Sequence, residues 1–232
     1  MEMVNIKING MPLSVPAGST TRAIIHAKKP GILAGVDLAR EVFHALDPSL
    51  KFTAILEDGA EMDATSVIAT VEGDAQAILT GERLSLNLLQ HLSGVATRTH
   101  QLAELIKPYR AKLVDTRKTT PGMRRLEKYA VRVGGGANHR LGLYDAMLIK
   151  DNHIKVAGGI TAALDRAHAY AGHMTKIEIE VENMDGVKEA LAAGADVIML
   201  DNMSADRMAE CVKVIDHKAV VEASGGITEE TI

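Results

Sequence analysis

The sequence predicts an α/β fold in which a small N-terminal module is followed by an α/β barrel. Beyond about residue 110, short β-like runs alternate with helical runs. This alternation is typical of parallel strands with helices outside them, in a doubly wound sheet or a barrel. Five of the strands end in polar or charged residues, and the sites of α/β barrels are built at such carboxyl ends, so the barrel is favoured.

The N-terminal module begins with a predicted β-hairpin. Residues 4–8 alternate polar and apolar, Asn9-Gly10 suits a tight turn because both residue types tolerate positive φ, and residues 13–15 resume the strand. Apolar runs bounded by turn residues predict further strands, and apolar residues at helical spacing predict one helix. In order, these elements are a strand at 23–27, the helix at 36–43, and strands at 51–56 and 67–71.

A long helix is predicted from Asp74 to about Leu105, because its apolar residues keep a helical period, with a kink at Gly94. The barrel elements follow as short apolar runs and amphipathic helical stretches. The strands are 112–115, 146–150, 176–181, 197–200 and 219–222, and the helices are 121–130, 161–170, 184–193 and 205–214. We therefore expect two domains, at residues 1–105 and 106–232.

Composition excludes several classes of protein. An apolar content of 47% is too high for a disordered chain, and a single cysteine, Cys211, rules out a disulfide scaffold. The net charge is −4, with no Trp and only two Phe, which argues against nucleic-acid binding. No apolar run approaches the roughly 18–20 residues of a membrane span, and no targeting segment is evident. We therefore expect a cytoplasmic protein that has no membrane partner.

Positive charge is concentrated in one part of this acidic chain. Residues 107–155 hold 12 Lys and Arg against 4 Asp and Glu. A solvated basic face is the simplest interpretation, but four of these cations lie at predicted strand ends or in Gly-flanked loops: Arg117, Lys118, Arg140 and Lys150. Arg offers a planar fork and Lys a compact charge to carboxylates or phosphates. The cluster predicts a strongly anionic small substrate, with nucleic acid as the competing partner.

Two glycine-rich loops are candidates for anion binding. Gly134-Gly135-Gly136, followed by His139 and Arg140, indicates either a backbone cradle for an anion or a mobile loop. The run Ser224-Gly225-Gly226 follows an apolar strand and is similar to the phosphate cradle of barrel enzymes.

Carboxylates complete the candidate site. Glu180, Glu182 and Asp201 could hold ribose hydroxyls, coordinate Mg²⁺, stabilise a developing cation, or act as counter-ions of the basic residues. Alternation places Glu180 and Glu182 on one face of their strand and the neighbouring apolar residues on the other. We interpret Asp151-Asn152-His153 as a structural loop rather than a metal site, because no second ligand pair has metal-like spacing.

Five stretches carry a resemblance to a known family. They are GERLSLNLLQHLSGVAT (81–97), DTRKTTPGMRRLEKYAVRVGGGANHRLGLYDAMLIKDNH (115–153), IEIEVEN (177–183), DVIMLDN (196–202) and VEASGGI (221–227). In these the chain resembles the nicotinate-nucleotide pyrophosphorylase, or quinolinate phosphoribosyltransferase, family. The resemblance implies an N-terminal α/β sandwich domain, an open α/β barrel, and a homodimer or higher homo-oligomer with shared active sites.

The resemblance also implies a reaction and a set of site residues. Phosphoribose would pass from phosphoribosyl pyrophosphate to quinolinate with Mg²⁺, giving nicotinate mononucleotide, pyrophosphate and carbon dioxide. The substrate-binding residues implied are Arg83 (from the neighbouring subunit), Arg117, Lys118, His139, Arg140, Lys150, Glu180, Asp201, Ser224, Gly225 and Gly226. The catalytic residues implied are Lys118, Lys150, Glu180 and Asp201, of which Glu180 and Asp201 would face the metal through water or substrate.

The chain departs from the family pattern at both ends. Residues 1–20 resemble the first hairpin of a ferredoxin-like domain, and the chain stops at Ile232, so the barrel is expected to be incomplete. Two alternatives stay open: a molybdenum-transport-associated relative of the same fold, and an inactive fragment that only binds anionic ligands.

Overall fold

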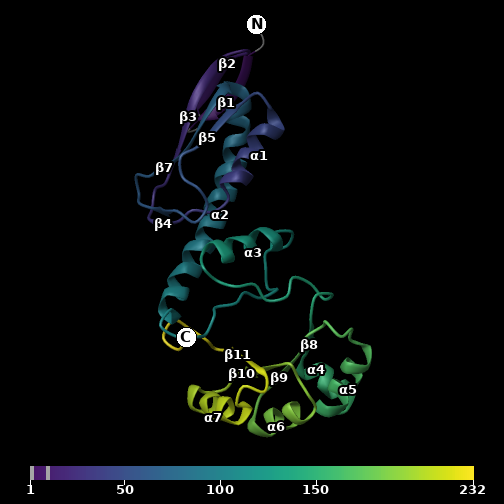
Figure 1. Cartoon of the computed structure of the whole chain (residues 1–232). Coiled ribbons are helices and arrows are strands. Elements are labelled where there is room, and N and C mark those ends of the chain that lie inside the picture. The colour runs from purple at the N-terminus through teal and green to yellow at the C-terminus, as the bar shows by residue number, and fades with distance from the viewer. Residues whose placement is uncertain (1–2, 9–10) are drawn as a thin grey trace. The chain divides into compact units, whose positions relative to one another are not determined.

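The computed structural model describes residues 3–8 and 11–232, with side chains from residue 15 onward, and Figure 1 labels its elements. The chain forms two compact units, Met1–His139 and Arg140–Ile232. The helix α3 (Arg124–Val133) packs on α2 (Ala75–Ile106), and this packing brings residues beyond 106 into the first unit. The two compact units meet at His139/Arg140, whereas the sequence predicts a domain boundary at 105/106. That domain boundary stays a prediction.

The first unit contains the hairpin and a small antiparallel sheet. The strand β1 (Met3–Ile8) pairs with β2 (Met11–Pro16) as predicted, while the turn residues Asn9 and Gly10 lie outside the described residues. Three further strands form one antiparallel sheet in the order β3 (Thr20–His26), β7 (Val67–Asp74) and β5 (Lys51–Ala54). The short strands β4 (Gly31–Ile32) and β6 (Glu61–Met62), which the sequence does not predict, pair with each other.

The sheet and two helices of the first unit enclose an apolar core. The helix α1 (Val36–Leu46) packs on α2, and its buried Phe43 joins a cluster of apolar residues from β3 and β7. Gly35 has no side chain with which to cap α1. Instead the Asp58 carboxylate accepts hydrogen bonds from the N–H groups of Gly35 at 2.9 Å and Val36 at 3.0 Å. The Tyr129 hydroxyl of α3 donates to the same carboxylate at 2.6 Å.

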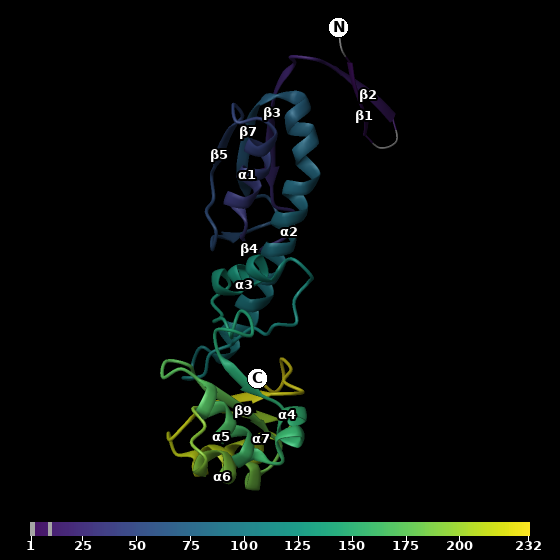
Figure 2. The same ribbon diagram turned by 90° about the vertical axis from the view of Figure 1, so that its right-hand side faces the viewer.

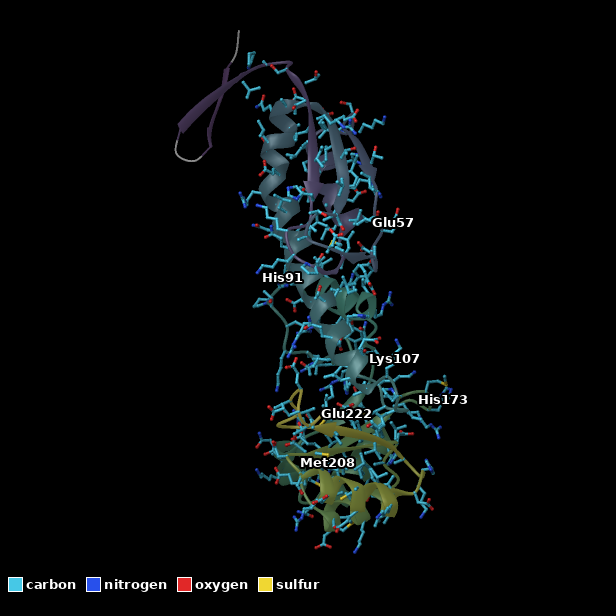
Figure 3. All side chains as sticks on the ribbon, turned by 90° about the vertical axis from the view of Figure 1, so that its left-hand side faces the viewer. Glu57, His91, Lys107, His173, Met208 and Glu222 are labelled. Atoms are coloured by element: carbon cyan, nitrogen blue, oxygen red, sulfur yellow. The ribbon has the colours of Figure 1, made fainter. Side chains whose placement is uncertain are left out.

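The helix α2 has 32 residues, a length of about 48 Å at 1.5 Å per residue, and continues without interruption through Gly94. It begins where the Asp74 side chain accepts a hydrogen bond from the N–H of Ala77 at 2.8 Å. A side-chain hydrogen bond also links α2 to α3. It joins His91 Nε2 and Glu127 Oε1 at 2.9 Å, and Figure 3 labels His91 on α2.

The glycine run after α3 has a packing role. A Cβ atom at Gly134 would lie 2.3 Å from the carbonyl oxygen of Ala96 on α2, and one at Gly136 would lie 2.8 Å from Thr99 Cγ2. Only glycine allows the backbone to pass α2 so closely. Close approach to a helix therefore accounts for these two glycines, rather than the anion cradle that the sequence suggests.

The second unit is a βα repeat with a parallel four-stranded sheet. Its strands lie side by side in the order β11 (Val220–Ser224), β10 (Val197–Asp201), β9 (Ile177–Val181) and β8 (Met147–Ile149), so each strand pairs with its neighbour in sequence. This is the succession of strands in an α/β barrel. The helices are α4 (Asp151–Ala157), α5 (Ile160–Tyr170), α6 (Met184–Ala192) and α7 (Ala205–Ile215).

Helices α5, α6 and α7 lie along one face of this sheet (Figure 2). The side chains of Ile177, Ile179 and Val181 point to the helices and are buried with Leu164, Val187 and Ile198. In Figure 3, Met208 of α7 lies on the helix side of the sheet and Glu222 on the opposite side. The face without helices is therefore the one that bears charged residues.

Two expectations about the barrel elements need correction. The predicted strand at 112–115 is reduced to a single parallel bridge between Val114 and Ala137, and α3 begins at Arg124 rather than at residue 121. The helix α4 is not predicted from the sequence, since only seven residues separate Lys150 from Gly158. Among the described residues, no helix is both long and apolar enough to cross a membrane.

Candidate active site at the carboxyl ends of the parallel strands

Charged residues line up on the helix-free face of the second unit's sheet. The register pairs Glu180 of β9 with Met199 of β10 and Met199 with Glu222 of β11, so these three residues form one row. Lys150 directly follows β8, and its Nζ lies 3.2 Å from Glu180 Oε2. The Glu180 side chain is 13% exposed and that of Lys150 50%, so the carboxylate is held inside while the ammonium faces solvent.

The next row toward the carboxyl ends holds Asp201 and Ser224, which are paired in register. The Asp201 carboxylate accepts a hydrogen bond from Asn202 Nδ2 at 2.5 Å, and the Asn202 N–H donates to the carbonyl oxygen of Ser224 at 3.0 Å. Asn202 itself has a φ of 54°, in the left-handed region. Strand ends β10 and β11 are thus tied together where Asp201 and Ser224 emerge.

The loop after β11 requires glycine. Gly225 has a φ of +77°, and a Cβ atom there would lie 2.3 Å from Asn202 Oδ1. Gly226 has a φ of +70° and faces open space. A side chain at Gly225 would collide with Asn202, which directly follows Asp201. Glycine at position 225 therefore allows the ends of β10 and β11 to lie close together.

Lys150 also begins helix α4. The Lys150 N–H donates to His153 Nδ1 at 2.9 Å, and Lys155 pairs with Asp151 at 2.9 Å across one helical turn. Asp151 and His153 therefore stabilise the start of a helix, in agreement with a structural role for this segment. The helix start fixes the backbone from which the Lys150 side chain reaches Glu180.

Arg140 begins the second unit in a loop that Asp145 organises. The Asp145 carboxylate accepts hydrogen bonds from the N–H groups of Leu141 at 2.6 Å and Gly142 at 2.9 Å. Desolvation raises the pKa of Asp145, but these two bonds and the nearby charge of Arg140 outweigh it and hold the pKa below its ordinary value. The loop that presents Arg140 is therefore closed around an ionised carboxylate.

The first unit carries the other predicted cations. Arg117 is half-buried and Lys118 exposed, and they follow Asp115 in a loop where the Lys118 N–H donates to Thr116 Oγ1 at 3.0 Å. The His139 N–H donates to Asp115 Oδ1 at 2.9 Å, which brings the His139 loop against the Arg117 loop. Arg83 lies elsewhere, exposed on α2, and no ion pair among the described residues includes it.

The predicted site residues thus fall into groups within each unit. The second unit brings together Lys150, Glu180, Asp201, Ser224, Gly225 and Gly226, with Arg140 at its start. The first unit brings Arg117 and Lys118 together with His139, through Asp115. Glu182 is exposed beyond the end of β9.

A large cavity in the first unit does not coincide with either group. It encloses about 1000 Å³ between β3 and α2, and among the predicted site residues only Arg83 lines it. Its walls are largely apolar, with Ile25, Leu86 and Leu89 among them. Apolar walls do not suit a polyanion, so the charge-bearing strand ends are the better candidate for the site.

Four polar residues around these groups were given no site role from the sequence, although Asp115 and Glu222 stood out as polar residues at predicted strand ends. Glu178 and Glu222 share the helix-free face with Glu180, and the same period-two alternation that singled out Glu180 could have found Glu178. Asp115 and Lys128 form a buried ion pair in the first unit. No sequence signal marks Lys128 among the many basic residues around it.

The donor set at the strand ends fits Mg²⁺. Glu180 and Asp201 offer carboxylate oxygens on neighbouring strands, and Mg²⁺ is bound in enzymes by one or two carboxylates together with water and substrate phosphates. Both carboxylates already have a donor, Lys150 Nζ and Asn202 Nδ2 respectively, so each is held in place on one side.

Consecutive parallel strands that end in cations, carboxylates and a glycine loop define an enzyme of the α/β-barrel class. The comparisons identify the family within that class. Residues 9–93 match the N-terminal domain model of quinolinate phosphoribosyl transferase, and residues 95–232 match the C-terminal domain model. The chain belongs to the quinolinate phosphoribosyl transferase family.

Curated relatives and solved structures agree with this assignment. The chain is 47% identical to a probable nicotinate-nucleotide pyrophosphorylase (carboxylating) of Bacillus subtilis, over 94% of this chain and 76% of the relative. It is also 47% identical to the probable enzyme of Synechocystis, over 87% of this chain and 70% of the relative. The crystal structure of NadC from Streptococcus pyogenes matches with a TM-score of 0.89 and 41% identity, over 92% of this chain and 75% of that one.

Proposed function

We propose that this chain transfers the phosphoribosyl group of phosphoribosyl pyrophosphate to quinolinate and releases carbon dioxide. The products are nicotinate mononucleotide and pyrophosphate, as in NAD biosynthesis. Family membership supports this proposal, together with the names of relatives that are 47% identical. The observation that carries it is the Lys150–Glu180 pair, beside Asp201 and Ser224 at the strand ends.

The charges of the substrates suit the predicted cations. Quinolinate carries two carboxylates and the donor carries several phosphate charges, so both need dense positive charge. In this proposal Arg117, His139 and Arg140 bind the quinolinate carboxylates and the donor phosphates. Arg forms forked, charge-assisted hydrogen bonds with such groups, whereas Lys118 and Lys150 act as point charges. Ser224, Gly225 and Gly226 hold the ribose 5-phosphate.

The carboxylates act on the ribose. The bond from ribose C1 to pyrophosphate breaks while the quinolinate ring nitrogen bonds to C1, and positive charge develops on the sugar. Glu180 and Asp201 stabilise that charge because they are fixed in place before the reaction. Mg²⁺, held by the same two residues through water or substrate, would neutralise the charge of the departing pyrophosphate.

Decarboxylation completes the reaction. The carboxylate next to the ring nitrogen leaves as carbon dioxide, its electron pair stays on the ring carbon, and that carbon takes up a proton. Cations stabilise the electron density, and the family resemblance implies this catalytic role for Lys118 and Lys150. The chemistry requires no nucleophilic side chain.

We further propose a homodimer, or a higher homo-oligomer, that works in the cytoplasm and shares its active sites. Arg83 supports the shared site, since it is exposed on α2 and belongs to a stretch that resembles the family. A direct assay tests the main proposal. The purified chain should form nicotinate mononucleotide from quinolinate, phosphoribosyl pyrophosphate and Mg²⁺, whereas quinolinate binding without product would favour an anion-binding protein.

A further inference from the structure

Lys128 is a buried cation that no part of the proposed chemistry uses. It lies on α3 with only 2% of its surface exposed, and its ammonium pairs with the Asp115 carboxylate, which is also buried. The same Nζ donates a hydrogen bond to the carbonyl oxygen of His139 at 2.9 Å. One ammonium thus holds both an acidic side chain and the backbone of a second loop.

The contacts of Asp115 and Asn138 close this network. Asp115 Oδ1 also accepts the His139 N–H, at 2.9 Å. With its amide oriented to suit its neighbours, Asn138 donates to Asp115 Oδ2 at 3.1 Å and to the Lys128 carbonyl oxygen at 3.0 Å. The Asp115 N–H donates to the Ala137 carbonyl oxygen at 3.1 Å. Every member is therefore bonded to at least two others or to the adjoining backbone.

The network joins the two loops that carry predicted site cations. Asp115 stands two residues before Arg117 and three before Lys118, and His139 stands next to Arg140. Lys128 touches both loops from a rigid helix, and α3 itself is fixed to α2 by the His91–Glu127 pair and to Asp58 by Tyr129. The two loops also bond to each other directly through Asp115, and Lys128 adds a contact from α3 to both of them.

We propose that Lys128 is a positioning residue that presents Arg117 and His139 to the anionic substrate in a fixed relative geometry. This inference rests on the proposed function. A buried ion pair adds little to stability compared with apolar residues of the same volume, because both charges must be desolvated. Its geometry is strict, however, and a binding site that is held within a fraction of an ångström needs such support.

The test compares Lys128→Met with two control variants. Methionine keeps most of the unbranched stem and removes the charge. Lys107→Met removes a charge from an exposed lysine at the end of α2, which Figure 3 labels. Val36→Ala weakens the first unit's core without touching the network. We expect Lys128→Met to lower kcat/KM for quinolinate at least 100-fold at temperatures where the folded state predominates, and both controls to stay within about threefold of the wild type.

Two further readouts separate positioning from a loss of stability. Amide hydrogen exchange of His139 should accelerate in Lys128→Met and stay unchanged in Val36→Ala. The losses in Lys128→Met and Asp115→Asn should not add, so that the double variant is no worse than the poorer single one. The inference is overturned if Lys128→Met keeps the wild-type kcat/KM, or if its loss equals that of a Val36→Ala variant with the same melting temperature. An inactive wild-type chain would refute the proposed function instead, while hydrogen exchange would still report on the network.

Discussion

Lys150 and Glu180 face each other at 3.2 Å across the carboxyl ends of two parallel strands. The carboxylate is mostly buried and the ammonium is half exposed, so the two groups differ in what they can do when a ligand arrives. Lys150 can turn to an incoming phosphate or carboxylate at little desolvation cost. Glu180 is held between the strands, and in the proposed reaction it would lie beside the sugar.

Glu180→Gln should therefore impair chemistry more than binding. The change keeps the shape of the side chain and removes the charge that stabilises the developing cation, so kcat should fall by roughly 100- to 1000-fold. Steady-state kinetics with both substrates measure this. Glu41→Gln, at an exposed position on α1, is the matched control and should keep wild-type kcat. An unchanged kcat in Glu180→Gln would remove Glu180 from the catalytic group.

Arg140→Lys should weaken quinolinate binding. Lysine preserves the charge but loses the planar fork that matches a carboxylate, and the cost should be roughly 1–3 kcal/mol. Calorimetric titration with quinolinate measures the affinity. Arg22→Lys, at an exposed arginine paired with Glu72, provides the comparison and should bind as the wild type does. Equal affinities for Arg140→Lys and the wild type would place Arg140 away from the dicarboxylate.

Gly225→Ala and Gly226→Ala form a natural pair. Both glycines have a φ near +70°, so alanine strains both, by about 1 kcal/mol each. Only at Gly225 would the new Cβ atom also meet Asn202, at 2.3 Å. Gly225→Ala should therefore be less stable than Gly226→Ala by roughly 1–3 kcal/mol, as measured by urea unfolding. Equal free energies of unfolding for the two variants would contradict the prediction, because they would show that Asn202 can move away from the new Cβ atom at no cost.

The Tyr129–Asp58 hydrogen bond should appear in the alkaline stability of the protein. Desolvation, followed by the bond to Asp58, raises the pKa of Tyr129 to about 12. Because the pKa of the folded state exceeds the unfolded value of about 10, the contribution is complete below pH 10 and is lost between about pH 10 and 12.

Tyr129→Phe should thus be less stable than the wild type at neutral pH, by about 1 kcal/mol, since Tyr129 is 38% exposed. The difference should shrink as the pH rises through that window. Melting curves of both proteins from pH 8 to 11.5 test the trend. A difference that stays constant over the whole range would exclude ionisation of Tyr129 as its cause.

Arg83 and Lys150 should complement each other between subunits if the proposed sites are shared. Arg83→Ala and Lys150→Ala should each be nearly inactive alone. After subunit exchange, half of the sites in a mixed dimer regain both groups, so activity should return. The measurement needs proof that heterodimers form, for example by purification through two different tags. Proven heterodimers without activity would place Arg83 outside the partner's site.

Most elements were predictable because burial imposes a period on the sequence. The strands β9, β10 and β11 and the helices α5, α6 and α7 begin and end within about three residues of their predicted bounds. Each has one face against the apolar core, so the apolar spacing alone defines it. The long helix is predicted just as closely, since 32 residues of regular spacing leave no other interpretation.

The segments that were predicted poorly are those shaped by single contacts. The run at 112–115 has the composition of a strand, but in the described part of the chain it forms a single β-bridge, between Val114 and Ala137. Helix α4 begins with a hydrogen bond between the Lys150 N–H and His153 Nδ1. A bond of this kind cannot be predicted from the spacing of apolar residues. At the site, the alternation of β9 located Glu180, whereas Lys128 depends on Asp115 and His139, 13 and 11 residues away in the sequence. Contacts of that kind become visible only after folding.

The close passage of Gly134 and Gly136 against α2 has a consequence for how this protein can change over generations. Gly134 and Gly136 lie against Ala96 and Thr99 with no space for a side chain, so any enlargement on one side must be matched by a retreat on the other. For this packing reason alone, both glycine positions should tolerate fewer substitutions than many of the charged positions around them. Among sequences that share this fold, we therefore expect Gly134 and Gly136 to vary little because of their packing on α2.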